Sequence, residues 1–252
     1  ISTLFFLLKI PSGIYMKWFQ LSPNFEIFIT RPWTLISYSF FHNSFFHLLW
    51  NMLLLYYSSS LLLNLFQDRI FINNYFLGVL SGGIIFMLSY SLFPVFKGSY
   101  PPMIGASAGV MAVFIFICTY SPDQEMRIIF FNLKLKYLGL AFFFLDVIQI
   151  PYGNSGGHLA HIGGALLGFF YARKLSNGID IGSGFEKLWK YLFLKNNLKT
   201  VYKSNSIREN SITKTELNQQ KKIDSILDKI SKSGYDSLSD EEKDFLFKAG
   251  KE

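Results

Sequence analysis

The chain has 252 residues and a formal net charge of +7; half of its residues are hydrophobic and only 16% are charged, against about 25% in an ordinary soluble domain. The charge is uneven, because residues 1–171 carry 13 charged side chains and residues 172–252 carry 28. This excludes the soluble globular, disordered and disulfide-scaffold classes for the first part, whereas the second part has the composition of an ordinary polar segment. The single cysteine, Cys118, lies in an apolar run and cannot form an internal disulfide.

Six apolar segments predict membrane-spanning helices, since each is bounded by prolines or other turn-forming residues. They cover residues 1–19, 43–63, 73–93, 107–120, 134–150 and 157–173. A signal peptide is the alternative for the first segment, which Lys9 and Pro11 interrupt, but the segment has no basic n-region and no small-residue cleavage site. The fourth has only 14 residues, which is about 21 Å of helix against a hydrocarbon core of about 30 Å. Either the span starts well below the bilayer surface or the segment before it dips into the membrane. Non-helical backbone at that depth must be buried in protein or line a wet cavity, so this short span indicates a site.

The positions of the basic residues predict the orientation of these spans. Six spans place both termini on one side. The loops on that side hold Arg69 and Arg127, with Lys134 and Lys136 at the start of the next span, and residues 172–252 add 16 Lys and Arg. The opposite loops hold only Arg31 and Lys97. We therefore expect both termini in the cytoplasm, and we interpret the positive charge as a topology signal and not as affinity for nucleic acid.

All four histidines lie in the apolar part of the chain, where a histidine is costly and indicates function. His47 and Asn51, four residues apart on one helix face, lie near the start of the second predicted span. Ser107 begins the fourth, and His161 lies near the start of the sixth. Even-numbered spans run in the same direction, so their starts meet at one membrane face. The topology thus predicts that these polar side chains lie at one depth, on the extracytoplasmic side.

Two motifs of small residues accompany Ser107 and His161. Ser107 lies in the run Gly105-Ala106-Ser107-Ala108-Gly109 at a predicted helix start, where backbone N–H groups have no intrahelical partner and the helix dipole favours negative charge. A hydroxyl there would lie beside an oxyanion site. After His161, Gly164 and Gly168 form a G-x-x-x-G face that allows a neighbouring helix to approach closely, as a Ser–His hydrogen bond requires. Packing alone is the alternative interpretation of both motifs.

The other polar residues of the spans have plainer interpretations. His42 would brace a loop, and His158 would be a structural hydrogen-bond partner or a surface residue. Asp146 is interpreted as a helix-bracing acid in preference to a catalytic third member, so that helix packing at Gly164, without a carboxylate, is expected to hold the His161 ring. Zinc would need three or four ligands, and the chain has no H-E-x-x-H motif and few intramembrane carboxylates. The sequence therefore predicts no metal and no cofactor.

Taken in order, four motifs resemble those of the rhomboid intramembrane serine proteases over about residues 31–172. They are Arg31-Pro32-Trp33-Thr34, His42-x-x-x-x-His47-x-x-x-Asn51, Gly105-Ala106-Ser107-Ala108 and Ala160-His161-Ile162-Gly163-Gly164. The resemblance implies an all-α membrane protein, a six-span rhomboid-like bundle of the bacterial type in the cytoplasmic (inner) membrane. One departure is Ala108, where family members often have glycine.

The resemblance also implies roles for individual residues. Ser107 would be the nucleophile and His161 the general base, with an oxyanion hole formed by the Ser107 N–H and the His47 and Asn51 side chains. His42, Gly105, Gly164 and Gly168 would support them. The substrates would be transmembrane segments of other proteins, cleaved within the lipid bilayer.

The polar part of the chain predicts a small separate unit. We expect the membrane domain to cover residues 1–175, an amphipathic or polar linker residues 176–221, and a small cytoplasmic helical hairpin residues 222–252, with no partner that the sequence identifies. Helical spacing of apolar residues after Ile223 ends at Gly234, and Ser239-x-x-Glu242 is a capping box for a second helix ending near Gly250. This hairpin resembles the small C-terminal domain of some bacterial rhomboid relatives.

Two other functions compete with proteolysis. A rhomboid-like pseudoprotease would bind transmembrane clients without cutting them, but it would not need both Ser107 and His161. A small transporter with a histidine proton relay would show internal repeats with broken spans in corresponding positions, whereas this chain has one short span without a counterpart.

Overall fold

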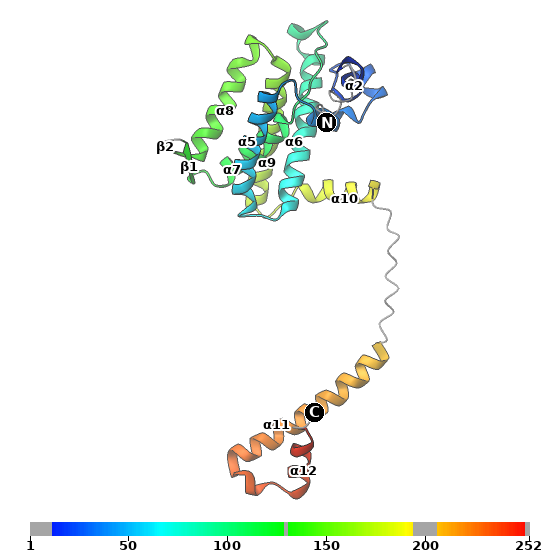
Figure 1. The fold of residues 1–252 in the computed structure, drawn as a ribbon, viewed down its shortest axis with the longest axis vertical. Helices are drawn as coiled ribbons and strands as arrows, with labels where there is room; N and C mark the ends of the chain where they lie inside the picture. The colour runs from blue at the N-terminus through cyan, green and yellow to red at the C-terminus, as the bar shows by residue number, and fades with distance from the viewer. Residues whose placement is uncertain (1–11, 129–130, 194–205, 250–252) are drawn as a thin grey trace. The chain divides into compact units, whose positions relative to one another are not determined.

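The computed structural model describes residues 12–128, 131–193 and 206–249. The chain divides into two compact units, residues 1–195 and residues 196–252. In the residues described, the first unit is a bundle of helices with a small antiparallel pair of strands, and the second contains two helices joined by a short turn (Figure 1).

Five of the six predicted spans coincide with helices. They are α5 (Phe45–Leu63), α6 (Asp68–Leu92), α7 (Ser107–Tyr120), α8 (Leu135–Gln149) and α9 (Ser155–Ser176). The first predicted span, residues 1–19, falls mostly outside the described residues, which include only its helix α2 (Ser12–Phe19).

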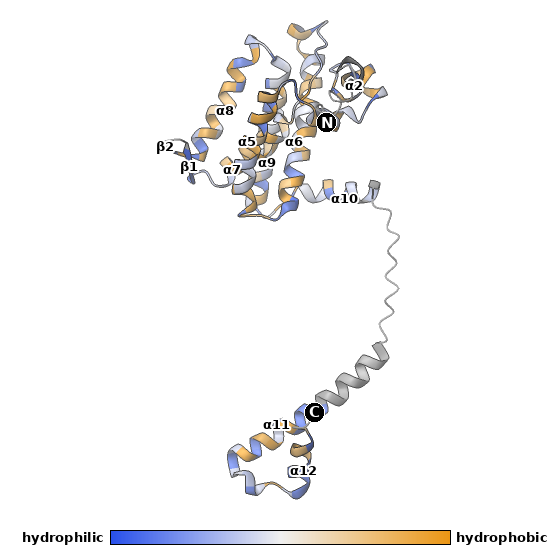
Figure 2. Ribbon diagram, viewed as in Figure 1, coloured by the Kyte–Doolittle hydropathy of each residue, from blue (hydrophilic) through white to orange (hydrophobic). Residues whose placement is uncertain are grey.

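Long hydrophobic helices give the bundle an apolar exterior. Among the described residues, three helical segments are long and apolar enough to cross a membrane, namely α5, α6 and the stretch Leu135–Tyr152 that contains α8. Large hydrophobic side chains on them are exposed, such as Trp50 on α5 and Ile148 on α8, and Figure 2 shows the hydrophobic colouring along these helices. An exposed apolar surface of this kind is typical of contact with lipid.

The connecting segments contain more regular structure than the sequence predicts. Between α2 and α5 lie the short helices α3 (Phe25–Thr30), α4 (Thr34–Ser37) and η1 (Tyr38–Phe40). The predicted loop 121–133 is wrong in part, because β1 (Glu125–Ile128) and β2 (Phe131–Lys134) pair antiparallel with Glu125 opposite Lys134. Short 3₁₀ turns follow α6 and α8, at η2 (Pro94–Phe96) and η3 (Ile150–Tyr152).

The short helix α7 occupies the centre of the bundle. Eleven of its 14 residues are buried, from Ala108 to Cys118, and it contacts α5, α6, α8 and α9. Glycines allow this, since a Cβ added at Gly164 would collide with the Ala108 carbonyl and one at Gly168 with the Ala112 carbonyl. The predicted G-x-x-x-G contact is therefore made between α9 and α7, and α7 is fixed by backbone against backbone.

Beyond α9, helix α10 (Gly182–Phe193) packs beside α6 and lies at a steep angle to the bundle helices (Figure 1). An ion pair between Arg69 of α6 and Asp180, 3.4 Å apart, lies at this junction.

The second unit contains the predicted helical pair. Helix α11 (Ser206–Ser233) ends before Gly234, and α12 (Asp240–Ala249) follows the η4 turn (Tyr235–Ser237). The capping box is confirmed, because the Ser239 N–H donates to Glu242 Oε2 at 2.8 Å and the Glu242 N–H donates to Ser239 Oγ at 3.3 Å. Helix α11 also includes residues 206–221 of the predicted amphipathic or polar linker.

Candidate active site

Ser107 is the first residue of α7, and the loop that leads to it is held by Tyr38 of η1 and by His42. The Gly105 N–H donates to the Tyr38 carbonyl at 3.0 Å, and the Ala106 N–H donates to His42 Nε2 at 3.3 Å. Gly105 has a φ of +135°, a conformation that residues with a Cβ rarely adopt. The two N–H groups before Ser107 are thus taken, and the chain turns so that Ser107 begins the helix.

His42 therefore braces this loop, as the sequence interpretation has it. As an acceptor from Ala106, its Nε2 is unprotonated. Burial lowers the pKa of His42 to about 4, and the neighbouring His47 adds to the effect. The two rings lie 5.0 Å apart edge to face.

One cavity of about 200 Å³ brings the predicted site residues together. Ser107, His161, His47 and Gly105 all line it, although they come from α7, α9, α5 and the preceding loop. A Cβ at Gly105 would lie 3.1 Å from His47 Nε2 and 3.5 Å from Ser107 Oγ, so both atoms flank the same face of this glycine. In this structure Ser107 and His161 share the cavity without a hydrogen bond between their side chains, as is common in enzymes without substrate.

Asn51 lies one helical turn below His47 and is not among the residues that line the cavity. Its side chain is buried, and its amide donates to the His47 carbonyl at 2.7 Å. The Asn51 amide thus bonds to the backbone of its own helix, and its role as a donor to the oxyanion stays a prediction.

The expectation that no carboxylate orients His161 is wrong. Asp146 Oδ1 on α8 lies 2.8 Å from His161 Nδ1 and 2.7 Å from His158 Nδ1 on α9. Asp146 is buried, and the two histidines are three residues apart on one face of α9. The sequence signal for this cluster was present, since Asp146 stands near the outer end of the fifth span, beside the start of the sixth. One carboxylate at this position does not by itself predict a hydrogen bond to His161, because the sequence does not show which way the Asp146 side chain points.

This cluster also bears on metal binding. One ligand atom each from Asp146, His158 and His161 lie within 4.8 Å of one another, so the described part of the chain gathers three ligand-type residues where the sequence predicted no metal site. Both Nδ1 atoms are already paired with the carboxylate, however, which accounts for the cluster without an ion.

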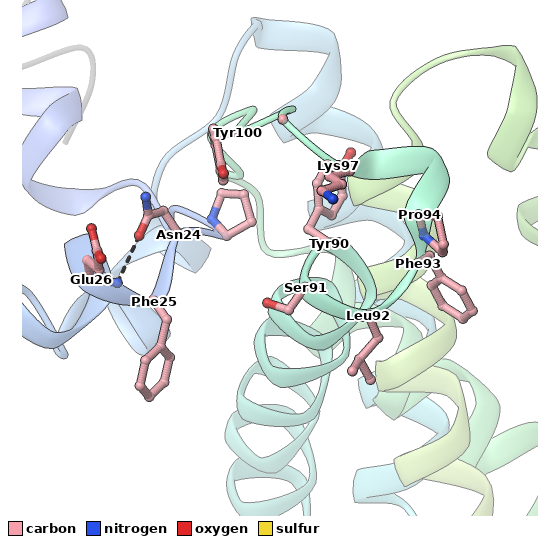
Figure 3. A pocket seen from close by; sticks show the side chains of 12 residues that line it. Asn24, Phe25, Glu26, Tyr90, Ser91, Leu92, Phe93, Pro94, Lys97 and Tyr100 are labelled. Atoms are coloured by element: carbon pink, nitrogen blue, oxygen red, sulfur yellow. Dashed lines mark hydrogen bonds between the residues drawn. The ribbon is translucent and has the colours of Figure 1, made fainter.

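A larger cavity of about 580 Å³ lies apart from this site, between the start of α3 and the end of α6 (Figure 3). Asn24 and Glu26 lie on one side of it and Tyr90 and Lys97 on the other, and none of the predicted site residues lines it. We therefore restrict the candidate site to the smaller cavity.

Comparison with known proteins gives the same family over most of the bundle. Residues 30–178 match the rhomboid domain, and residues 210–249 match a family of unknown function, DUF6576. No solved structure matches the chain.

Two kinds of relatives illustrate the match. The chain is 30% identical to the presenilin-associated rhomboid-like protein, mitochondrial, of Homo sapiens over 74% of this chain and 46% of that protein, with a similar match in Bos taurus. It is 25% identical to RHOMBOID-like protein 12, mitochondrial, of Arabidopsis thaliana over 61% of this chain and 52% of that protein. The chain spans about half the length of these relatives.

The rhomboid domain matches residues 30–178, more than half of the chain, and these residues include every helix that lines the candidate site. The chain is therefore an all-α integral membrane protein that belongs to the rhomboid family.

Proposed function

We propose that this protein is an intramembrane serine endopeptidase that cleaves transmembrane segments of other membrane proteins. The observation that carries the proposal is the single cavity lined by Ser107 at the N-terminus of α7 and by His161 of α9. A serine hydroxyl, an imidazole and free helical N–H groups are the parts that peptide hydrolysis needs.

Ser107 Oγ attacks the carbonyl carbon of the substrate peptide bond, and its proton passes to His161 Nε2. The resulting oxyanion accepts hydrogen bonds from the Ser107 N–H and from the His47 side chain, each of which contributes about 3 kcal/mol in sites of this type. His161 then donates its proton to the departing amine as the C–N bond breaks. A water molecule gives a proton to His161 and attacks the ester, and the same proton returns to Ser107 Oγ as the acid product leaves.

Asn51 supports His47 in this scheme by donating to its carbonyl, and His42 supports the loop before Ser107. Three glycines let the parts of the site lie close together: Gly105 faces His47 and Ser107, and Gly164 and Gly168 face the backbone of α7. No metal and no cofactor takes part in the proposed reaction.

The substrate enters from the lipid as a helix, and its amides are hidden in helical hydrogen bonds. Substrates with helix-weakening small residues, such as glycine, or with proline near the cleaved bond are therefore preferred, because their helices unwind more readily. The distribution of basic residues supports an orientation in which both termini face the cytoplasm of a bacterial cell. In a mitochondrial membrane, where the named relatives belong, the same distribution would place them in the matrix.

The test is cleavage of a single-span substrate by the full chain in proteoliposomes. We expect cleavage by the wild type, none by Ser107→Ala, and labelling of Ser107 by a fluorophosphonate that His161→Ala abolishes. Binding of the substrate without cleavage or labelling would contradict the proposal and favour a pseudoprotease.

A further inference from the structure

We propose that Asp146 is a positioning residue for His161, so that a carboxylate on α8 sets the tautomer and the orientation of the base. This inference rests on the proposed function.

The hydrogen bonds of Asp146 determine which ring nitrogen of His161 carries the proton. A carboxylate only accepts hydrogen bonds, so the Nδ1 atoms of His161 and His158, 2.8 and 2.7 Å from Asp146 Oδ1, both donate. A neutral imidazole has one N–H, which leaves Nε2 of His161 as an acceptor. That is the tautomer a general base needs when it takes a proton from a serine hydroxyl.

His158 fixes the carboxylate. The two rings are 5.8 Å apart and nearly perpendicular, at 81°, so their N–H groups reach one oxygen from different directions. Among the described residues, Asp146 has no ion pair with a lysine or arginine; its charged or chargeable partners are these two histidines. A buried carboxylate with a single partner would be free to turn, whereas two donors on one helix face hold it in place.

Helix α8 packs loosely against its neighbours, so a hydrogen-bonded link to α9 adds to its attachment. A cavity of about 520 Å³ lies between α8 and its neighbours α7 and α9, lined mainly by apolar side chains. Packing alone therefore holds α8 less firmly than it holds α7. The two hydrogen bonds of Asp146 tie this helix to α9 at the site itself. When His161 accepts the proton of Ser107, the carboxylate stabilises the imidazolium without becoming protonated.

The tautomer of His161 can be measured without any change to the cluster. In full-length protein labelled with ¹⁵N-histidine and reconstituted in lipid, the ¹⁵N shifts of the ring report which nitrogen is protonated, and the His161→Gln variant assigns the signal. We expect the proton on Nδ1 of His161 near neutral pH. A wild-type His161 with its proton on Nε2 would overturn the inference.

Kinetics of Asp146→Asn then test the consequence. An amide can donate to Nδ1 and so favour the wrong tautomer. We expect kcat to fall at least about 100-fold, with KM within about twofold and with an unchanged melting temperature. Asp68→Asn removes an exposed carboxylate at the start of α6 and should leave kcat unchanged.

The outcomes separate the possible roles. An unchanged kcat per fluorophosphonate-labelled site in Asp146→Asn would show that the carboxylate only braces the helices. Loss of wild-type activity on chelation, restored by zinc, would assign the cluster to a metal and also overturn the inference. If Asp146→Asn does not fold, the inference is tested by the wild-type protein alone, through the ring nitrogen of His161 that carries the proton. Absence of all cleavage and labelling in the wild type would refute the proposed protease, while the tautomer measurement would still report on Asp146.

Discussion

Helix α9 makes two contacts of opposite character, one with α7 and one with α8. Against α7, Gly164 and Gly168 leave no room for a Cβ, and backbone lies on backbone. Against α8, the packing leaves a cavity of about 520 Å³, and the link near the site consists of the hydrogen bonds of Asp146 to His158 and His161.

The difference implies that α7 and α8 affect His161 in two different ways. The rigid contact with α7 sets where the His161 backbone lies relative to Ser107, since Gly164 is one turn from His161 and touches the residue after Ser107. The looser contact with α8 sets how the ring is turned. Substitutions in the two contacts should therefore have different signatures, a joint loss of stability and cleavage for the first and a loss of kcat at unchanged stability for the second.

The largest expected effect comes from Gly164→Val in the rigid contact. The added side chain meets the Ala108 carbonyl, which cannot move aside without displacing α7, so we expect a destabilisation of about 1–3 kcal/mol or more. Cleavage should fall at least about 100-fold because Ser107 and His161 separate. The measurement is the melting temperature together with cleavage of a single-span substrate.

Gly184→Val is the matched control, because a Cβ at Gly184 in α10 has no heavy atom within 4 Å. Its cleavage rate and melting temperature should stay close to those of the wild type. Near-normal cleavage by Gly164→Val would show that the α7–α9 contact tolerates a shift and would remove the distinction between the two contacts.

The rigid contact was predictable from the sequence, and the looser one was not. G-x-x-x-G spacing and the length of the fourth span depend only on local residues, and α7 has the predicted bounds of Ser107–Tyr120. The pairing of Asp146 with two histidines depends on the rotation of α8 about its axis. Because α8 is apolar on nearly all sides, the spacing of its apolar residues does not show which face packs against α9. The hydrogen bond from the Asn51 amide to the His47 carbonyl was missed for a different reason: it depends on the side-chain rotamer of Asn51 within α5, which the spacing of the two residues does not determine.

An intermediate effect is expected at His42, which supports the loop on the α7 side of the comparison. His42→Phe keeps a ring but removes the acceptor of the Ala106 N–H, so cleavage should fall about three- to tenfold and stability by about 1 kcal/mol. A loss as large as that of Gly164→Val would mean that the loop, and not the helix contact, fixes Ser107.

The pH dependence of stability gives His42 a second signature. Its pKa in the folded protein is lowered to about 4 by burial and by His47, against about 6.5 for a free histidine. The unfolded chain therefore binds more protons between these values, and the contribution of His42 to stability is complete above pH 6.5 and lost as the pH falls towards 4. The melting temperature should decline over this range in the wild type and less steeply in His42→Phe; equal slopes would contradict the assignment.

The smallest effect should come from Gly139→Ala, which adds one methyl group to the face of α8 that packs against α7. Its Cβ would lie 2.8 Å from Cys118 Cβ and 3.2 Å from Cys118 Sγ, so α8 must move by a few tenths of an ångström, and its lipid-exposed side leaves it free to do so. Asp146 lies two turns further along α8, where both histidine N–H groups can follow a small displacement. We expect kcat to stay within about threefold of the wild type and the melting temperature to drop slightly, whereas Gly164→Ala, the same added methyl against a backbone carbonyl, should still reduce cleavage strongly. Equal losses in the two variants would mean that α8 is fixed as firmly as α7. The hydrogen bonds of Asp146 would then be a consequence of helix packing, and packing would hold the ring of His161.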